Sequence, residues 1–302
     1  MGKKQSKKNV MHKSKFEQSA KEQYIEVFDG SQLRVLSFEH PPNPTEDIEI
    51  MFIPGLLTIF PRWEKVVQEL NEHYKVHYIE SREKKTSRLV KRATMKIQEF
   101  KSDLDYIEKA LGLDKRKYIT MSSSMGGAQV LENLVTKGIN PIGSILLSPG
   151  VELIFPKWAP IFLRFVPAFA ITLLKPYVRW HIRNKTVDAE KEPQQARDYV
   201  RSVNEADVKK LRRIVVKNAN RYDGWHLLPK IKDRIILIGA STDKAHSEEF
   251  SKRVSKELVN CTYFDLGTNK AAHDTPLVEV TMEFMKELSG KGPKVEEIKL
   301  SK

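Results

Sequence analysis

Short apolar segments with the character of buried strands alternate with helical patterns along most of this chain. Residues 62–70 and 90–111, for example, carry apolar side chains at helical spacing between two such segments. Strands that alternate with helices predict a parallel, doubly wound α/β sheet, because each return to the same edge of the sheet needs a crossover. The strand segments are predicted at residues 48–53, 74–79, 117–122, 143–148, 234–239 and 261–266.

The alternation stops between Val151 and Ile231, where helical patterns follow one another without a convincing strand. Residues 22–38 hold two further strands around Asp29-Gly30, which indicates an antiparallel hairpin at the edge of the sheet. A chain of 302 residues is long enough for one large α/β domain with an insertion or for two small domains. The pattern predicts one domain with a helical cap inserted after the sixth strand, counting the two strands of the hairpin. The predicted parts are a disordered basic tail (1–21), an α/β core (22–150 and 232–290), the cap (151–231) and a flexible C-terminal tail (291–302).

The strand predicted at residues 117–122 runs into Ser122-Ser-Ser124-Met-Gly126-Gly127, and an amphipathic helical pattern follows at once. A strand, a serine between small residues and a helix form the order that a nucleophile elbow needs, because the strained turn accepts only small residues two positions away. Ser124 is therefore the candidate nucleophile, and the backbone N–H of Met125 a candidate oxyanion donor. The alternative is a serine-rich turn that only closes a strand.

Two other loops supply candidate oxyanion donors and a candidate carboxylate to orient the catalytic base. The strand at residues 48–53 ends in Pro54-Gly55, and the backbone N–H of Leu56, with Leu57 second, can face an oxyanion beside the nucleophile. An ordinary strand-to-helix turn is the alternative. Asp243 follows the strand at 234–239 and is the candidate acid, since a carboxylate there can orient a histidine. Its rivals are Glu248, Glu249 and Asp265.

His273 lies on the loop after the last predicted strand, just before a helical pattern that starts near Pro276. A free imidazole near neutral pH can take and return the proton of a serine, so His273 is the candidate base. His246 competes, but it lies only three residues after Asp243, too close in sequence to be the group that Asp243 orients across a site.

The order serine, acid, histidine, each on a loop after a separate strand, resembles the α/β-hydrolase superfamily, in the capped branch that holds monoacylglycerol-lipase-like and other carboxylester hydrolases. The resemblance covers roughly residues 22–290. Ser124-Met-Gly-Gly127 is identical to the commonest form of that family's elbow, Pro54-Gly55 stands where His-Gly is usual, and Ser148-Pro149-Gly150 matches the end of the strand before the cap. The resemblance implies that Ser124 is the nucleophile, Asp243 the acid, His273 the base, and the N–H groups of Leu56 and Met125 the oxyanion donors.

Three positions depart from the family pattern. Ser122 stands where glycine is usual. The glycine-rich Asp-x-Arg-Gly-x-Gly-x-Ser segment is here Glu80-Ser-Arg-Glu-Lys-Lys-Thr-Ser87, so this loop is rebuilt and its role is open. The acid loop, Gly239-Ala-Ser-Thr-Asp243, is one residue longer than usual.

The first part of the predicted cap, residues 155–174, is unusually apolar. Packing of the cap on the sheet edge is one explanation, and an acyl-chain channel or a face that dips into lipid is the other. A transmembrane helix is not expected, because Arg164 and three prolines interrupt the run. The predicted substrate-contacting residues are Leu57, Ser123, Phe155, Trp158 and Phe162.

The predicted activity is hydrolysis of carboxylic esters through an acyl-enzyme, on lipid-like substrates such as a monoacylglycerol or a lysophospholipid. Three alternatives remain: an acyltransferase with the same triad, an aminopeptidase, which would need an acidic group in the cap, and a non-catalytic binding protein with this fold. The sequence shows no metal-ligand spacing and no nucleotide-binding loop, so neither a metal nor a cofactor is expected.

The net charge of +13 favours contact with polyanions, but no nucleic-acid-binding signature accompanies it, so no specific nucleic acid is expected. One cysteine, Cys261, and the lack of a secretory signal pattern predict a cytoplasmic protein. Met1-Gly2-Lys-Lys-Gln-Ser6 matches the N-myristoylation pattern and is followed by more lysines, which predicts peripheral contact with anionic membranes through the N-terminus and the basic cap. A disordered lysine-rich tail is the alternative.

Overall fold

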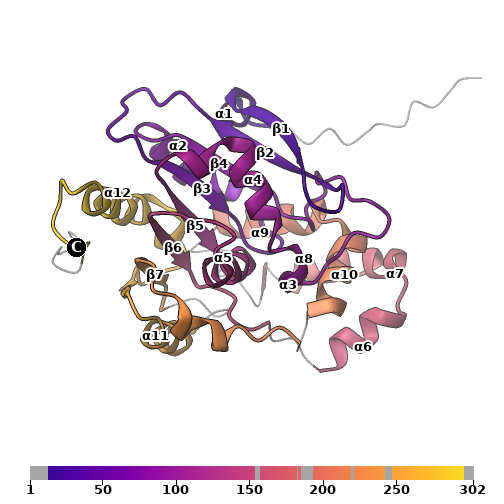
Figure 1. Ribbon diagram of the computed structural model, residues 1–302. Helices are drawn as coiled ribbons and strands as arrows, with labels where there is room; N and C mark the ends of the chain where they lie inside the picture. Colours follow the sequence, from indigo (N-terminus) through magenta and orange to yellow (C-terminus); the bar gives the residue numbers. More distant parts are fainter. Residues whose placement is uncertain are drawn as a thin grey trace, which may run out of the picture.

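An eight-stranded sheet forms the centre of the computed structural model, in the order β1-β2-β4-β3-β5-β6-β7-β8 (Figure 1). The structure describes residues 13–153, 157–181, 183–184, 193–218, 221–241 and 247–295. All six predicted strands and the predicted edge hairpin are present. Their bounds are β1 (Lys21–Glu26), β2 (Gln32–Phe38), β3 (Glu49–Ile53), β4 (Val76–Ile79), β5 (Tyr118–Ser123), β6 (Gly143–Leu147), β7 (Ile235–Gly239) and β8 (Cys261–Asp265).

The pairing of the strands follows the predicted pattern. β1 and β2 are antiparallel, β2 joins β4 antiparallel, and every pair from β4 through β3 to β8 is parallel. The carboxyl ends of β3 and β5–β8 therefore meet at one edge of the sheet, where the loops after them can share a site. The fold is a mostly parallel, doubly wound α/β sheet.

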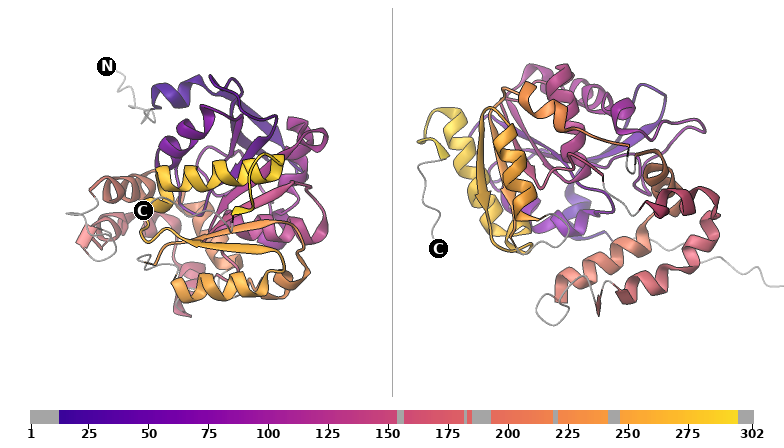
Figure 2. Two further views of the ribbon diagram at one scale, coloured as in Figure 1. Left: turned by 90° about the vertical axis from the view of Figure 1, so that its left-hand side faces the viewer. Right: turned by 90° about the horizontal axis from the view of Figure 1, so that it is seen from below.

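Both faces of the sheet are buried under helices, as the layers in Figure 2 show. Alternate residues of β3 divide between two cores: Ile50 and Phe52 face one, Met51 and Ile53 the other. The first core is closed by α1 (Lys15–Ser19), α2 (Phe60–Asn71) and α12 (Thr275–Ser289), and the second by α4 (Asp103–Leu111), α5 (Met125–Thr136) and α11 (Glu248–Glu257). Burial on both faces explains why the central strands carry apolar residues on both of their sides.

A helical insert, defined here as the described residues of α6–α10, stands between β6 and β7 and gathers at one side of the sheet (Figures 1 and 2). Its helices are α6 (Trp158–Phe165), α7 (Ala168–Leu173), α8 (Lys175–His181), α9 (Pro193–Glu205) and α10 (Val208–Asn218), and the short helix η3 (Trp225–Lys230) leads into β7. Among the described residues, no helix combines the length and apolarity that crossing a bilayer requires.

The helix predicted over residues 90–111 is wrong in its first part. Only α3 (Ile97–Phe100) and α4 are helical, and the chain before them is irregular. Asn218 of α10 explains the difference, because its side-chain amide donates to Met95 O at 2.6 Å and its carbonyl oxygen accepts from Ile97 N at 2.8 Å. Hydrogen bonds to Asn218, more than 120 residues away in the sequence, thus replace hydrogen bonds that a helix would have made internally.

The described chain is also ordered earlier than the predicted tail, which extended to residue 21. Ser14 caps α1 by accepting a hydrogen bond from Glu17 N at 2.9 Å. Phe16 stacks on Phe38 with ring centroids 4.4 Å apart. Residues 14–19 therefore belong to the folded core.

Candidate active site

Ser124 occupies the turn between β5 and α5 and has an unusual backbone, with φ 43° and ψ −116°. A positive φ at a residue other than glycine is strained by about 1–3 kcal/mol and persists only where the surroundings enforce it. The end of β6 enforces it here: Ser124 N donates to Leu147 O at 3.0 Å, and Gly150 N donates to Ser124 O at 2.8 Å. The predicted strand–serine–helix turn is therefore present, with its serine in the strained conformation of an elbow.

The small residues around Ser124 are explained by close packing. A Cβ on Gly126 would lie 2.3 Å from Ile53 O, and one on Gly127 would lie 2.7 Å from Pro149 Cβ. Both approaches are too close for any side chain, so β3 and the loop after β6 can reach the elbow only if these positions are glycine. Ser122, the departure two residues before the elbow, is fully buried, and its Oγ has no hydrogen-bond partner among the described residues.

His273 ends the short helix η4 (Ala271–His273), which lies between β8 and α12. Its Nδ1 lies 2.8 Å from Asn269 O, and because a carbonyl can only accept, this contact puts a proton on Nδ1. Its ring stacks on Trp63, with centroids 4.3 Å apart, and Trp63 is completely buried. Two contacts thus orient the imidazole and leave Nε2 as the nitrogen with basic character.

Asp243, the predicted acid, lies outside the described residues, as do the competing His246 and the predicted substrate contact Phe155. Asp243 stays a prediction. Two of the rivals, Asp265 and Glu248, have other partners. Asp265 Oδ1 accepts from Ser241 N and Gly267 N, both at 2.9 Å, and Glu248 in the first turn of α11 pairs with Lys252. Asp265 therefore shapes the loops after β7 and β8.

The loop after β3 lies against the elbow. A Cβ on Gly55 would be 3.1 Å from Ser124 Cβ and 3.2 Å from Ser123 Oγ, so a side chain there would have to push the elbow away by a few tenths of an ångström. Leu57 in the same loop has φ 60° and is 37% exposed. The N–H of Met125, the first of α5, has no intrahelical acceptor by position. Both predicted oxyanion loops thus adjoin Ser124, and the two N–H groups remain candidates.

The rebuilt segment 80–87, whose role the sequence leaves open, lies beside this loop and is buried except at Lys85 and Thr86. The Lys84 side chain is 8% exposed, and its ammonium donates to Gly55 O at 2.7 Å. The same ammonium pairs with Glu83 at 2.7 Å. No pattern in residues 80–87 predicts the hydrogen bond from the buried Lys84 to Gly55 O, because the acceptor is a backbone atom 29 residues away.

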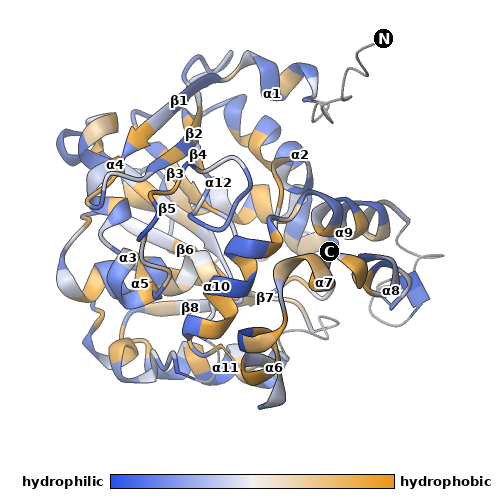
Figure 3. Ribbon diagram, turned by 90° about the vertical axis from the view of Figure 1, so that its right-hand side faces the viewer, coloured by the Kyte–Doolittle hydropathy of each residue, from blue (hydrophilic) through white to orange (hydrophobic). Residues whose placement is uncertain are grey.

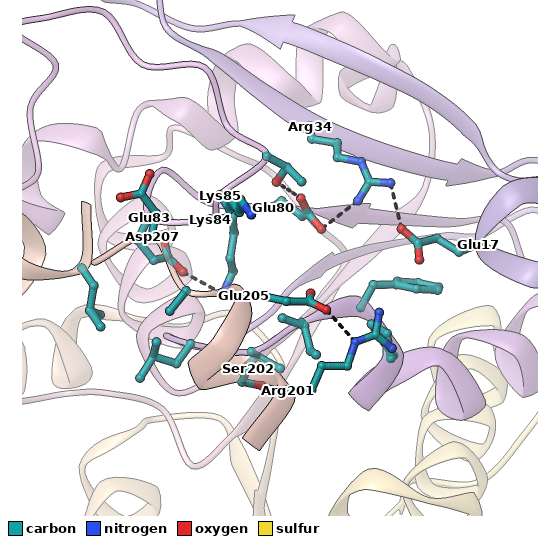
Figure 4. Close-up of a pocket in the computed structure, with 18 residues that line it drawn as sticks. Glu17, Arg34, Glu80, Glu83, Lys84, Lys85, Arg201, Ser202, Glu205 and Asp207 are labelled. Carbon is teal, nitrogen blue, oxygen red and sulfur yellow. Dashed lines mark hydrogen bonds and ion pairs between the residues drawn. The ribbon is translucent and has the colours of Figure 1, made fainter. Parts of the chain in front are cut away.

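A cluster of charged side chains surrounds this segment (Figure 4). Arg34 is fully buried and binds Glu80 at 3.0 Å and Glu17 at 2.9 Å. Burial raises the pKa of the Glu80 carboxyl, against the opposing effect of Arg34. From the helical insert, Lys210 Nζ donates to Lys84 O at 2.7 Å, and burial lowers the pKa of Lys210. The segment therefore joins the β3 loop, the sheet edge and the insert.

An apolar cavity of about 190 Å³ opens between the helices of the insert and Leu57. Leu57 was predicted to contact substrate, and it lies on this wall. Trp158 and Phe162, predicted for the same role, are instead 65% and 45% exposed and do not line it. The lining includes Leu163, Ile171, Leu174, Val178, Val203, Leu211 and Val215. Ser123 is buried next to Gly55.

Within the described part of the chain, neither the cysteine thiol nor a metal site competes with Ser124 as the reactive group. Burial raises the pKa of the Cys261 thiol to about 12, which disfavours its thiolate. The described residues contain no group of three or more His, Cys, Asp or Glu side chains placed to hold a metal ion.

The sequence matches no protein-family model and no curated protein. Solved structures do match. An enol-lactonase from Burkholderia xenovorans LB400 superposes with a TM-score of 0.71 at 15% identity, over 87% of this chain and 100% of that chain. A bromoperoxidase from Bacillus anthracis gives a TM-score of 0.69 at 16% identity, over 88% and 100%. A thermophilic esterase from Thermogutta terrifontis gives 0.68 at 15% identity, over 89% and 99%.

The chain has the α/β-hydrolase fold, as its resemblance to that superfamily implied. The three neighbours carry names of different activities on one fold, so the fold does not choose among them. The reaction has to be argued from the residues of the site. The monoacylglycerol-lipase-like branch stays a prediction.

Proposed function

We propose that this protein is a serine hydrolase that cleaves carboxylic esters with an apolar acyl group through an acyl-enzyme. The observation that carries the proposal is the strained backbone of Ser124, held at φ 43° at the end of β5. Such strain is costly and concentrates at functional sites. The oriented ring of His273 on the loop after β8 supplies a base at the same edge of the sheet.

In the proposed reaction His273 accepts the proton of Ser124 Oγ while Oγ bonds to the ester carbonyl carbon. The carbonyl electron pair moves to oxygen, which accepts hydrogen bonds from the N–H groups of Leu56 and Met125. Losing one such donor typically costs about 100- to 1,000-fold in rate. The C–O bond then breaks, and the leaving alkoxide takes the proton from His273. Water then attacks the acyl-enzyme with His273 again as the base, which releases the carboxylic acid product and restores Ser124. Asp243 is the proposed carboxylate of the triad that stabilises the imidazolium.

Lys84 is proposed as a positioning residue in this reaction. The carbonyl of Gly55 and the N–H of Leu56 belong to one planar peptide and point in opposite directions. The bond from Lys84 Nζ to Gly55 O at 2.7 Å therefore fixes the direction of the Leu56 N–H. A preorganised donor stabilises an oxyanion without reorganisation when the charge appears.

The acyl group is proposed to occupy the apolar cavity beside Leu57, whose lining is almost entirely hydrocarbon. Each buried methylene contributes about 0.8 kcal/mol, so chain length should strongly affect the specificity constant. A medium or long acyl chain, as in a monoacylglycerol or lysophospholipid, suits this cavity better than acetate does.

The test is hydrolysis of p-nitrophenyl esters from acetate to palmitate by the native protein, Ser124→Ala and the matched control Ser123→Ala. We expect Ser124→Ala to lose at least about 1,000-fold in kcat, because the nucleophile is gone. Ser123→Ala keeps the nucleophile and should keep kcat within about tenfold, with any loss in KM, because Ser123 is a predicted substrate contact. A fluorophosphonate probe should label the native protein and Ser123→Ala only. Activity that survives in Ser124→Ala, or a native protein that is neither active nor labelled, would reject the proposal.

A further inference from the structure

Helices α6–α8 carry an exposed apolar face, defined here by six side chains that are each more than 60% exposed: Trp158, Ile161, Phe165, Phe169, Leu173 and Tyr177. Ten of the fifteen exposed large apolar side chains among the described residues fall within residues 158–180. Figure 3 shows the apolar colouring of α6 and α7 on the outside of the molecule. Apolar residues scattered singly on a surface need no explanation, but a concentration like this one marks an interaction site.

Hydrogen bonds hold the helices of this face to the rest of the insert. Behind it, Arg212 of α10 donates from Nη2 to Arg164 O at 2.6 Å and from Nε to Leu163 O, so it satisfies carbonyls at the end of α6. Lys175 at the start of α8 donates to Asn204 O at 3.1 Å and Ala206 O at 3.2 Å. The helices are therefore attached through polar contacts on their inner side, while their large apolar side chains point away from the core.

The stretch of chain that carries this face has charges of one sign. Residues 157–184 contain no aspartate or glutamate, whereas the whole chain has 39 in 302 residues. The same stretch holds five lysines or arginines, of which Lys157, Arg164 and Arg183 are exposed. The negative surface potential of an anionic bilayer attracts a basic residue that lies next to it. Apolar side chains ringed by cations are the composition that binds shallowly at an anionic lipid surface.

We propose that the exposed apolar face of α6–α8 docks this protein on an anionic lipid bilayer. The helices have 8, 6 and 7 residues, so they lie in the interface and do not cross it. Trp158 and Tyr177 have the amphipathic rings that favour the headgroup level. A second copy of the chain is a poorer occupant, because a two-fold interface would place the same basic residues opposite one another.

Docking in this orientation has a consequence for the site. The inner side of the same helices lines the cavity at Leu57 through Leu163, Ile171 and Val178. A bilayer on the outer side would therefore lie one helix layer from the cavity proposed for the acyl group. This consequence rests on the proposed function, whereas docking itself does not.

The test is flotation of the full-length protein, produced in a bacterium that adds no N-terminal acyl chain, with phosphatidylcholine vesicles with and without 30% phosphatidylglycerol. We expect binding to the anionic vesicles and little to the neutral ones. Phe165→Ser with Phe169→Ser should weaken the partition coefficient at least about tenfold, given roughly 1.5–3 kcal/mol for burying each phenylalanine. Val259→Ser, at a 64% exposed valine outside the insert, is the matched control and should bind as the native protein does.

A charge pair of variants completes the design. Lys157→Glu with Arg164→Glu should weaken anionic binding, whereas Lys115→Glu with Lys117→Glu, the same change at exposed positions before β5, should not. The basic N-terminal residues are unchanged in every variant, so they cannot produce these differences. Equal binding by Phe165→Ser/Phe169→Ser and the native protein would overturn the proposal. So would a native dimer that this double variant converts to a monomer. Ser124→Ala should bind vesicles normally, which separates docking from hydrolysis.

Discussion

The segment 80–87 and the helices α6–α8 reverse the usual distribution of side chains in opposite ways. In the first, charged residues lie inside: Arg82 is fully buried and Lys84 nearly so. In the second, large apolar residues lie outside, with Phe165 77% exposed. Both regions adjoin the loop that carries Leu57, one through Lys84 and Gly55 and the other through the apolar cavity.

The energetic consequences of the two regions differ. A buried charge is tolerable only while its partners stay in place, so 80–87 is rigid by necessity. An exposed apolar side chain costs the fold little and becomes valuable only when something covers it. The comparison therefore predicts that substitutions in 80–87 act on stability and catalysis, and that substitutions on α6–α8 act on association.

The largest expected effect is at Arg82, which binds Asp103 through Nε at 2.6 Å and Nη2 at 2.7 Å and also binds Asp29 at 2.6 Å. Arg82→Met leaves a buried carboxylate without its cation and should lower the free energy of unfolding by about 3–5 kcal/mol. Urea denaturation measures this. The control Arg88→Met removes an exposed arginine that lies over Tyr24 and should cost about 1 kcal/mol or less.

The loss at Arg82→Met should also grow with pH. Burial already raises the pKa of Asp103 to about 6, although Arg82 acts to lower it. Without Arg82 that pKa rises further, so the folded state binds more protons than the unfolded state and stability falls as pH increases. A loss that is the same at pH 5 and pH 8 would contradict the pairing.

The next effect is at Lys84. Lys84→Met frees the Gly55 carbonyl, and we expect kcat for a p-nitrophenyl ester to fall about 10- to 100-fold with little change in KM, because the oxyanion exists only in the transition state. Lys84→Arg should restore part of the rate. The double variant Lys84→Met/Glu83→Gln removes both buried charges together and should recover stability without recovering kcat. Recovery of kcat in the double variant would assign Lys84 a purely structural role.

A smaller effect is expected on the loss of stability at low pH. Burial acts to raise the pKa of Glu22, but hydrogen bonds from Arg34 and Lys13 hold it at about 2. Its folded pKa lies below the unfolded value, so its contribution is complete above about pH 4.5 and disappears as pH falls toward 2. Glu22→Gln should give a shallower fall in urea midpoint between pH 4.5 and 2.5 than the native protein. Glu72→Gln, at an exposed position after α2, should leave the slope unchanged.

The smallest effect is expected on the exposed face. Phe165→Ser should change the free energy of unfolding by no more than about 0.5 kcal/mol, because the ring has almost no protein neighbours to lose. Phe52→Ala, at a ring that is 1% exposed between the sheet and Trp63, should cost about 3–5 kcal/mol by the same measurement. A large loss at Phe165 would mean that the face is part of the core.

The sequence predicted the sheet and the elbow because both depend on neighbours along the chain. Residues 117–127 contain a whole strand, the small residues of a strained turn and the start of a helix, and the structure places Ser124 in that turn. It failed at residues 90–96, whose conformation is set by Asn218. The substrate contacts predicted at Trp158 and Phe162 stay predictions, since an apolar helix pattern gives a face without saying what lies opposite.

What the sequence by itself determined was the α/β-hydrolase fold and the position of its candidate nucleophile, since strand and helix periodicity and turn chemistry are local properties. Only the tertiary structure decided that the charges of Glu80 and Arg82 are buried, because their partners at Arg34, Asp29 and Asp103 come from other elements. It likewise decided that the rings of α6–α8 face outward, because which side of a helix is covered depends on contacts between segments far apart in the chain.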